Sequence, residues 1–420
     1  MFGKVYSRHI RLCRQVEEGQ INVERYQRAA LCSLLKHALT TVPFYRENYQ
    51  INVDSISADN AYEALQHFDY LDKATVMASP EKFISNKYRS DSLLSKTSGG
   101  STGQGIRVFY NRRELGIERA YVEYPWYRLG YNPWALLVQA NANTRRDYKD
   151  GPFGYGIRRV YLNCDHTTSE WMPQVVRTLC RLRPSFLHGF PSAWVAVALG
   201  FRKAGMKLPV KGVLLCSEQV FPEQISLLQE VFGPVHVGYG QSERAAIANG
   251  ELENGEVQYK LVPTYSYTEI AASEYGLSEI VGTNLFVKTM PLIRYRTQDL
   301  GKLNANGTIL SLDGRKQETL VTLNGHRVPA TNIRIDPFVW DHVESYQFVQ
   351  NRPGVLELHI VRRDSYNEDI EKLLLEKQIS RMGKLFDIKI IYIQKVENTK
   401  AGKQRLIVSN LEKNGGSLCH

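Results

Sequence analysis

Residues 185–240 read SFLHGF PSAWVAVALG FRKAGMKLPV KGVLLCSEQV FPEQISLLQE VFGPVHVGYG. Across this stretch and just before it, short apolar runs alternate with segments of helical periodicity. The apolar runs lie at residues 134–139, 156–161, 185–188, 212–216 and 235–239. The helical segments include residues 171–181 and 193–204. This rhythm predicts an α/β fold with a mainly parallel sheet and helices on both faces, with ligand sites at the carboxyl ends of its strands.

Outside this stretch the pattern changes twice. Residues 8–37 have the spacing of one or two amphipathic helices, and residues 92–110 read as two strands joined by a glycine-rich loop. After residue 261 the strands follow one another closely, and residues 313–315 (Asp-Gly-Arg) predict a polar turn. Beyond that turn we expect strands at 319–323, 346–350, 355–361 and 388–393, and a helix at 366–381. The sequence therefore predicts a large domain over residues 1–313, a boundary at 314–318 and a small α+β domain over 319–420.

Composition excludes several classes of protein. The chain has 420 residues, of which 43% are hydrophobic and 23% charged, which is typical of a folded globular protein. It shows no apolar secretion signal near Met1, and its longest apolar stretch, near residues 193–201, is less than half of a membrane span. We therefore expect a cytoplasmic protein with no membrane span.

Cysteine spacing and the distribution of charge argue against a zinc site and against a nucleic-acid partner. The six cysteines are scattered without zinc-ligand spacing, so we expect no zinc site. The net charge of +10 comes from dispersed basic pairs rather than a basic run, which favours a solvated surface over a nucleic-acid partner.

The glycine-rich loop Thr97-Ser98-Gly99-Gly100-Ser101-Thr102-Gly103-Gln104-Gly105 is the most informative motif. It holds four glycines and four hydroxyl residues in nine positions. Glycines let successive backbone N–H groups face one concavity, and hydroxyls add donors, so the loop predicts phosphate binding.

Two other motifs overlap this loop. Residues 99–103 also satisfy G-x-S-x-G, which would make Ser101 a hydrolase nucleophile, but the polar residues before it and the strand after it are not a strand–turn–helix context. The Walker A reading fails because Ile106-Arg107 replaces the required Lys-Ser/Thr.

Two later motifs offer groups that could hold a nucleotide. Gly238-Tyr-Gly-Gln-Ser-Glu243 follows an apolar run, so Tyr239 could pack on a purine and Glu243 could bind Mg²⁺. Asp299, after Arg294 and Arg296, could accept both hydroxyls of a ribose. Each of these motifs is equally compatible with a surface turn when taken alone.

Taken in order, the motifs resemble those of a known superfamily. The loop at 97–105, Tyr239-Gly-Gln-Ser-Glu243, Arg296-Thr-Gln-Asp299, Gly314-Arg315 and Gly402-Lys403 resemble the core motifs of the AMP-forming adenylating enzymes. The closer similarity is to the short branch around phenylacetate-CoA ligase and the CapK-like capsular polysaccharide proteins. The stretches that carry this closer similarity are Thr41-Val-Pro-Phe-Tyr-Arg46, Gly189-Phe-Pro-Ser192 and Cys216-Ser-Glu218. The chain departs from the superfamily at Gln104-Gly105, where Pro-Lys is common, and at Lys316-Gln317-Glu318, where an acidic pair is common.

This resemblance implies an enzyme that uses ATP and Mg²⁺ to convert a small-molecule carboxylic acid, of aryl or short acyl type, into an acyl-adenylate. The acyl group would then pass to a thiol of CoA or of a phosphopantetheine on a carrier protein. Lys403 and Glu243 would be catalytic, Glu243 would also hold the metal, and Gln317 would lie in the hinge before a mobile lid formed by residues 319–420. The resemblance assigns ATP binding to Thr97, Ser98, Gly99, Gly100, Ser101, Thr102, Gly103, Glu218, Tyr239, Gly240, Ser242, Asp299 and Arg315.

The acid itself is not defined by any motif. Aromatic and apolar residues suggest a pocket for it, formed by Tyr124, Trp126, His188, Phe190 and Pro191. His188 is equally consistent with a satisfied core histidine. Alternatives to the ligase are an adenylyltransferase that moves AMP to a hydroxyl, a hydrolase that uses Ser101, and an inactive scaffold. A homodimer stays open.

Overall fold

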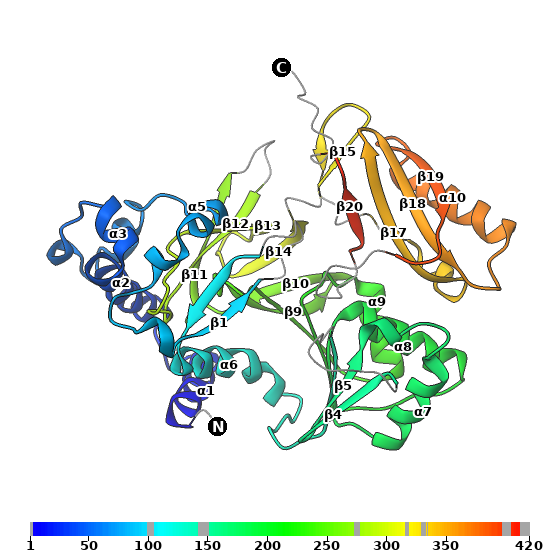
Figure 1. Ribbon diagram of the computed structural model, residues 1–420, viewed down its shortest axis with the longest axis horizontal. Helices are drawn as coiled ribbons and strands as arrows, with labels where there is room; N and C mark the ends of the chain where they lie inside the picture. The colour runs from blue at the N-terminus through cyan, green and yellow to red at the C-terminus, as the bar shows by residue number, and fades with distance from the viewer. Residues whose placement is uncertain are drawn as a thin grey trace.

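The computed structural model in Figure 1 describes residues 3–98, 105–141, 151–272, 278–315, 319–328, 333, 335–396 and 405–411. The amphipathic region at the start, for which one or two helices were predicted, forms two: α1 (Gly3–Glu17) and α2 (Val23–Thr41). Asn22 caps α2 by accepting the N–H of Arg25, and Pro43 opens α3 (Pro43–Asn48), where a proline costs no helical hydrogen bond. Short helices follow: η1 (Val53–Ser55), α4 (Ala61–Leu65), α5 (Lys73–Ala78), η2 (Pro80–Phe83) and η3 (Ser90–Ser92).

The strands predicted around the glycine-rich loop form an antiparallel hairpin. Strands β1 (Leu94–Thr97) and β2 (Arg107–Tyr110) pair in a separate two-stranded sheet. The long helix α6 (Arg112–Tyr127) follows directly, and a capping box between Asn111 and Glu114 fixes its start. Helix α1 packs against α6, and the N-terminal helices gather on one side of the molecule (Figure 1).

A twelve-stranded sheet forms the centre of the molecule, in the order β11-β12-β13-β14-β10-β9-β8-β7-β6-β3-β5-β4. Its first half along the chain consists of β3 (Leu137–Asn141), β4 (Phe153–Gly156), β5 (Arg159–Asn163), β6 (Phe186–Gly189), β7 (Gly212–Cys216) and β8 (Val235–Gly240). Its second half consists of β9 (Ile247–Glu253), β10 (Glu256–Leu261), β11 (Ser266–Ala272), β12 (Ser278–Asn284), β13 (Tyr295–Leu303) and β14 (Ile309–Arg315).

The predicted α/β class is confirmed, but the sheet is less parallel than the rhythm suggested. The neighbouring strands β5, β3, β6, β7 and β8 run parallel, whereas β4 and the strands from β9 to β14 pair antiparallel. The physical reason is connection length, because parallel neighbours need a long crossover and antiparallel ones are joined by short turns.

Helices cover both faces of the parallel part. Helices α7 (Met172–Leu182), α8 (Pro191–Lys203) and α9 (Pro222–Val231) bury Leu187 and Val213 on one face, and η4 (Cys164–His166) precedes them. On the other face Phe186 and Leu214 pack with Trp126 of α6. The alternation of side chains along β6 and β7 thus serves two cores at once.

The predicted polar turn at residues 313–315 is wrong. These residues end β14 and pair with β13, where Asp313 is the extra residue of a bulge and Gly314 takes a φ of 95°. Sheet pairing overrides the local preference of Asp-Gly for a turn. The bulge also sets Arg315 directly opposite Asp299.

The C-terminal residues form a small α+β unit, as predicted. Strands β19, β18, β17 and β20 make a four-stranded sheet, and β15 and β16 make a hairpin at its edge (Figure 1). The elements are β15 (Leu320–Val321), β16 (Arg327–Val328), η8 (Pro337–Asp341), β17 (Val343–Arg352), β18 (Val355–Arg362), α10 (Glu368–Met382), β19 (Asp387–Tyr392) and β20 (Ile407–Ser409). None of the helices in the described ranges is long and apolar enough to span a bilayer.

Candidate functional site

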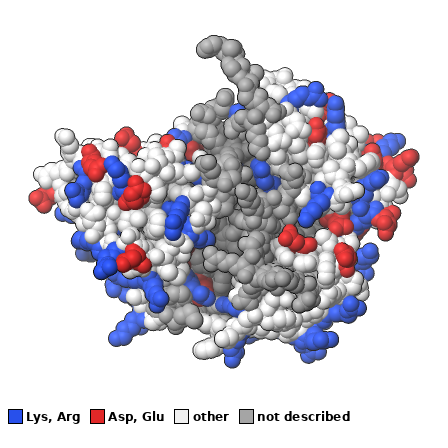
Figure 2. Space-filling view, in the orientation of Figure 1, with Lys and Arg blue, Asp and Glu red and all other residues white. Residues whose placement is uncertain are grey.

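A cleft of about 830 Å³ lies between the large sheet and the C-terminal unit. The large sheet contributes the ends of β7 and β8 and the segment 238–243, and the opposite wall includes Glu344, Tyr346, Lys395 and Arg405. Polar contacts join the walls: Arg202 pairs with Asp341 at 2.8 Å, and Ser169 Oγ donates to Glu344 Oε2 at 2.8 Å and accepts from Arg363 Nη1 at 3.3 Å. Outside the cleft, basic and acidic side chains are interspersed on the face shown in Figure 2, which agrees with the dispersed charge pattern of the sequence.

Asp299 is the centre of a polar network on the floor of the cleft. Its carboxylate accepts hydrogen bonds from Tyr239 Oη at 2.9 Å and Gln241 Nε2 at 3.1 Å, and Arg315 Nε lies 3.3 Å away. Gln241 also donates to the Tyr239 hydroxyl. The nearby carboxylate and, above all, burial raise the pKa of Tyr239, so its hydroxyl stays protonated as a donor. The predicted partners Tyr239, Asp299 and Arg315 therefore do come together, on β8, β13 and β14.

Glu243 lies beside this network and lines the same cleft. Burial raises its pKa, the charge of Asp299 adds to the rise, and a hydrogen bond from Ser98 and the ammonium group of Lys73 oppose it. Ser98 and Lys73 also line the cleft. Glu243, Ser98 and Lys73 thus bring a carboxylate, a hydroxyl and an ammonium group to the lining of one cleft.

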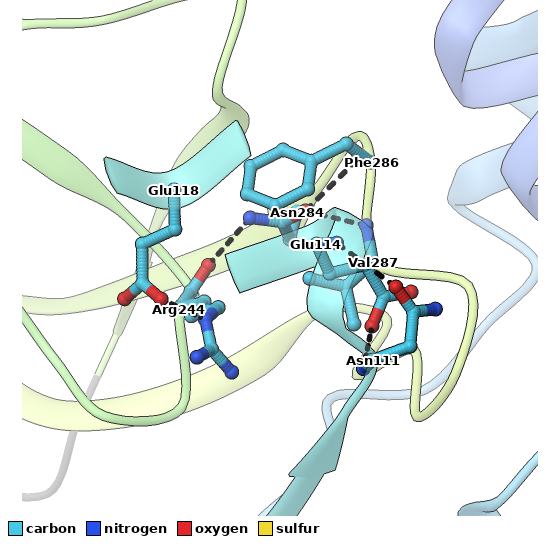
Figure 3. Close-up of polar contacts among 7 residues, drawn as sticks. All are labelled: Asn111, Glu114, Glu118, Arg244, Asn284, Phe286 and Val287. Carbon is cyan, nitrogen blue, oxygen red and sulfur yellow. Dashed lines mark hydrogen bonds and ion pairs between the residues drawn. The ribbon is translucent and has the colours of Figure 1, made fainter. Parts of the chain in front are cut away.

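A buried ion pair fixes the loop that carries Glu243. Arg244, with a φ of 59°, donates from Nε to Glu118 Oε2 of α6 at 2.6 Å, and its carbonyl accepts a hydrogen bond from Asn284 Nδ2 at 2.9 Å (Figure 3). The Asn284 side chain in turn accepts the backbone N–H groups of Phe286 and Val287. The geometry of this loop therefore depends on Glu118, which lies 126 positions before Arg244, and on Asn284, which lies 40 positions after it.

The ends of the glycine-rich loop are pinned together. The Ser98 backbone N–H donates to the Ile106 carbonyl at 2.9 Å, and the Ile106 N–H donates to Ser98 Oγ at 3.0 Å. Gly105 is required here because a Cβ would lie 1.9 Å from the Ser98 carbonyl oxygen. Residues Gly99, Gly100, Ser101, Thr102 and Gly103 lie outside the described residues. The flanking hairpin is not the strand–turn–helix that a Ser101 nucleophile would need.

Lys403 and Gln317 also lie outside the described residues. On either side of the segment 397–404, Val396 and Arg405 line the cleft, and so does Ser98 at the start of the glycine-rich loop. The described residues that flank these two segments therefore line a single cleft.

The predicted acyl pocket needs correction. Trp126 and His188 line the cleft, with ring centroids 5.3 Å apart, and burial lowers the pKa of His188 to about 4. Tyr124 instead donates its hydroxyl to Glu17 at the junction of α6 and α1. Its side chain points away from the Trp126 side, because residues two apart on an α-helix differ in direction by about 200°. Phe190 and Pro191 are buried at the start of α8, where Phe190 belongs to the core under the helices.

Glu218 has a local structural partner. It accepts the backbone N–H of Ser192 at 3.0 Å and the Ser192 hydroxyl at 3.1 Å, at the first turn of α8. The sequence motifs at 189–192 and 216–218 are therefore two halves of one helix-capping contact. Glu218 also lines the cleft, as do Gly240 and Ser242, whereas Thr97 is an exposed residue at the end of β1.

The structure adds residues that the sequence reasoning missed. Lys73 begins the short helix α5, and no motif marks it. Gln241 stands inside the 238–243 motif, where its contact with Asp299 could have been suspected. His236 lines the cleft from β8, and Asn249 does so from β9. No group of three or more His, Cys, Asp or Glu residues suited to a metal occurs in the described ranges.

Comparisons with known proteins find relatives among the CapK proteins. Residues 320–410 match the CapK C-terminal domain family. Protein CapK of Staphylococcus aureus is 20% identical over 366 residues, which cover 81% of this chain and 79% of that protein. The resemblance to the CapK-like branch of the adenylating superfamily is thereby confirmed.

Solved structures with this fold include CoA ligases. A 2-hydroxyisobutyryl-CoA ligase in the postadenylation state, in complex with R3-HIB-AMP, aligns with a TM-score of 0.66 at 14% identity, covering 92% of this chain and 89% of its own. The anthranilate CoA ligase AuaEII, in complex with anthranoyl-AMP, aligns with a TM-score of 0.52 at 13% identity, covering 76% and 67%. The chain thus has the fold of adenylate-forming ligases with a small C-terminal domain.

The alignments also include the same ligase in a second state. Against the 2-hydroxyisobutyryl-CoA ligase in the thioesterification state, the TM-score falls to 0.52 at the same 92% coverage of this chain. Both alignments show the same fold.

Proposed function

We propose that this chain is an ATP-dependent adenylate-forming enzyme that joins a small carboxylic acid to AMP and releases pyrophosphate. One observation carries the proposal: the Asp299 network, Glu243 with Ser98, and the residues that flank Lys403 all line a single cleft. The fold shared with adenylating ligases supports it.

We propose the following division of the chain for this activity. Residues 1–313 form the large domain, residues 314–318 form a hinge that includes Gln317, and residues 319–420 form a lid. The change from the twelve-stranded sheet to the C-terminal sheets directly after β14 supports this boundary. A few residues between two domains can absorb the dihedral changes of domain rotation.

The cleft suits a nucleotide in size and in donor chemistry. Asp299 is a carboxylate already fixed by a guanidinium and two neutral donors, which fits it to accept ribose hydroxyls, with Arg315 at its edge. Tyr239 would pack on the adenine beside Gly240 and Ser242. The loop from Thr97 to Gly103 would hold the β- and γ-phosphates.

Three charged residues of the cleft suit a triphosphate and its metal ion. Lys73 and Lys96 line the cleft near Ser98 and bring positive charge to the phosphate end. Glu243 offers carboxylate oxygen, the ligand type that Mg²⁺ prefers, and one protein carboxylate suffices because this ion is usually held by substrate phosphates and water as well. When bound, Mg²⁺ would supply positive charge to the phosphate oxygens.

The chain's own residues would then direct the reaction by charge. A substrate carboxylate oxygen attacks the α-phosphorus of ATP, and the bond to the pyrophosphate oxygen breaks with its electron pair. Both reactants are anionic, so the step needs a cation between them. We assign this role to Lys403, which would contact the α-phosphate and the carboxylate from the lid.

We propose a thiol of CoA or of a carrier phosphopantetheine as acceptor of the acyl group. The CoA ligases that share the fold support this choice. The second candidate, transfer of AMP to a hydroxyl, predicts a stable adenylylated product and no thioester, so product analysis by mass spectrometry separates the two.

The test is pyrophosphate exchange into ATP with a panel of carboxylic acids and Mg²⁺, with hydroxylamine to trap acyl-adenylate. Lys403→Ala should lower the exchange rate by about 100- to 1,000-fold, because a preorganised charge contact is lost. Lys389→Ala is the matched control, since Lys389 lies on β19 and pairs with Asp387 at 3.7 Å. Exchange at the wild-type rate in Lys403→Ala would contradict the assigned role, and absence of exchange with every acid would contradict the proposed function.

A further inference from the structure

Part of the cleft lies between helix α6 and the strands β6 to β9. Helix α6 contributes Trp126 and Val122 to its lining, and the strands contribute His188, His236, Gly238 and Asn249. The Trp126 and His188 ring centroids are 5.3 Å apart, so an apolar wall and an imidazole meet at one end. We call this part of the cleft the α6 pocket.

Strand pairing explains why these polar groups share a face. His188 pairs with Leu214, Leu214 pairs with His236, and all three lie in one row across β6, β7 and β8. Gly238 follows two residues after His236 on the same face and pairs with Asn249 of β9. The two imidazoles and the Asn249 amide therefore lie in adjacent rows under α6.

Gly238 leaves room over one imidazole. A Cβ at this position would lie 3.9 Å from His236 Nε2, so any larger side chain would cover that nitrogen. Both Gly238 and His236 line the cleft. A ligand group in the α6 pocket can thus approach Nε2 past the glycine.

The polar groups of the α6 pocket have spare hydrogen-bonding capacity. Within the described parts of the chain, neither ring nitrogen of His236 nor the side-chain amide of Asn249 has a hydrogen-bond partner, and His188 Nε2 has a weak contact with Cys216 Sγ at 3.7 Å. Burial lowers the pKa of both histidines to about 4, so near pH 7 each is a neutral ring that can donate and accept.

Two ion pairs of α6 lie near the pocket. Glu118 is paired with Arg244 at 2.6 Å, and Arg119 is paired with Glu123 at 2.6 Å. Arg159 of β5 has no ion-pair partner among the described residues, but it does not line the cleft, so a second carboxylate in the pocket would lose its hydration without contacting a cation directly. A purely aliphatic group would leave the imidazoles and the amide without partners, which weakens binding by about 5- to 150-fold for each buried group.

We propose that the α6 pocket selects a carboxylic acid that carries a neutral hydroxyl on a compact aryl or short acyl body, with His236 and Asn249 as its hydrogen-bond partners. This inference rests on the proposed function, because it takes the acid to be the substrate. His236 and Tyr239 both lie on β8, three residues or about 10 Å apart along the strand, and both line the cleft.

The chemical basis of the selection is asymmetric. A pocket that hydrogen-bonds a hydroxyl rejects the analogue without it strongly, because the buried polar groups are then unpaired. With two such groups we expect at least about a 30-fold preference for the hydroxylated acid.

The experiment compares matched pairs of acids: 4-hydroxyphenylacetate with phenylacetate, 3-hydroxybenzoate with benzoate, and 3-hydroxybutyrate with butyrate. Their Kd values are measured by calorimetry on the full chain in the presence of a non-hydrolysable ATP analogue and Mg²⁺, and kcat/KM is measured by pyrophosphate release. In the wild type at least one hydroxylated acid should exceed its partner by about 30-fold or more.

Variants test whether the named residues cause this preference. His236→Phe and Asn249→Leu should each reduce it by about fivefold or more, whereas His236→Gln, which keeps a neutral donor and acceptor, should retain most of it. His359→Phe is the matched control, because His359 lies on β18 and bonds to Glu357. Thermal unfolding of each variant separates loss of folding from loss of selectivity, and Asn249→Leu provides the test if His236→Phe does not fold.

The two hypotheses fail in different ways. Failure of the wild type to bind the ATP analogue would overturn the proposed function. If the analogue binds, three results would overturn the present inference alone. These are that none of the acids binds, that no hydroxylated acid is preferred, or that His236→Phe and Asn249→Leu leave the preference intact.

Discussion

Replacing Asp299 by Asn tests the nucleotide site without removing much of the protein. Asp299 is 7% exposed, and its carboxylate accepts hydrogen bonds from Tyr239 and Gln241 and pairs with Arg315. In Asp299→Asn the amide oxygen can still accept from Tyr239 and Gln241, while the NH₂ group faces Arg315. Because the Arg315 side chain is 39% exposed, loss of this ion pair should change the free energy of unfolding by less than about 1 kcal/mol.

The effect on ATP should be much larger. A ribose offers two hydroxyls, and a hydrogen bond to a charged group contributes about 1.5–3 kcal/mol. The asparagine keeps one neutral acceptor, so it should lose about 2–3 kcal/mol of binding free energy, which is about 30- to 150-fold in Kd.

The measurement is calorimetric titration of ATP with Mg²⁺, with thermal unfolding as a check on the fold. Asp313→Asn is the matched control, because Asp313 is the bulge residue two positions before Arg315 and should leave the Kd for ATP unchanged. Equal Kd values for wild type and Asp299→Asn, or equal losses in Asp299→Asn and Asp313→Asn, would refute the assignment of Asp299 to the ribose.

Three further predictions concern the loop, the metal ligand and the hinge. Glu118→Gln should lower the free energy of unfolding by about 3 kcal/mol in chemical denaturation, because it leaves the buried Arg244 without its ion partner. The control Glu251→Gln, at an exposed ion pair, should lower it by under about 1 kcal/mol. Equal effects of the two substitutions would argue against a buried pair. The pKa of Glu243 is raised in the folded protein. As pH falls, Glu243 should therefore become protonated and lose its ability to bind Mg²⁺ at a pH above about 4.3, the pKa of an ordinary glutamate. The pH profile of Mg²⁺-dependent kcat/KM for ATP should show that midpoint, and a midpoint at the ordinary value would count against Glu243. Gln317→Pro should slow thioester formation more than pyrophosphate exchange, and an equal loss of both rates would rule out a hinge there.

Much of the parallel sheet was predictable because its strands are local signals. Residues 212–216 form β7 as expected, and 235–239 form nearly all of β8, since a strand buried on both faces is a short apolar run bounded by turn residues. The antiparallel strands from β9 to β14 were not assigned individually. Their alternation is weaker, and nothing in a single strand specifies its partner.

The site was predictable in its residue types and less so in its geometry. Tyr239, Glu243, Asp299 and Arg315 stand in motifs whose chemistry suggests a nucleotide, and the structure brings all four to one cleft. The acyl pocket was misassigned at Tyr124 because an aromatic residue on a helix does not reveal which face will meet the ligand.

The sequence by itself determined which short strands and helices form, and which residues carry charge, hydroxyls and glycine flexibility, because these depend on neighbours along the chain. The tertiary structure alone decided that the Asp-Gly-Arg segment ends a strand and aims Arg315 at Asp299, that Glu218 caps the helix begun by Pro191, and that His236 and Asn249 line one pocket with Trp126. These contacts join residues far apart in the sequence, and their energies come from burial and pairing that exist only after the sheet has assembled.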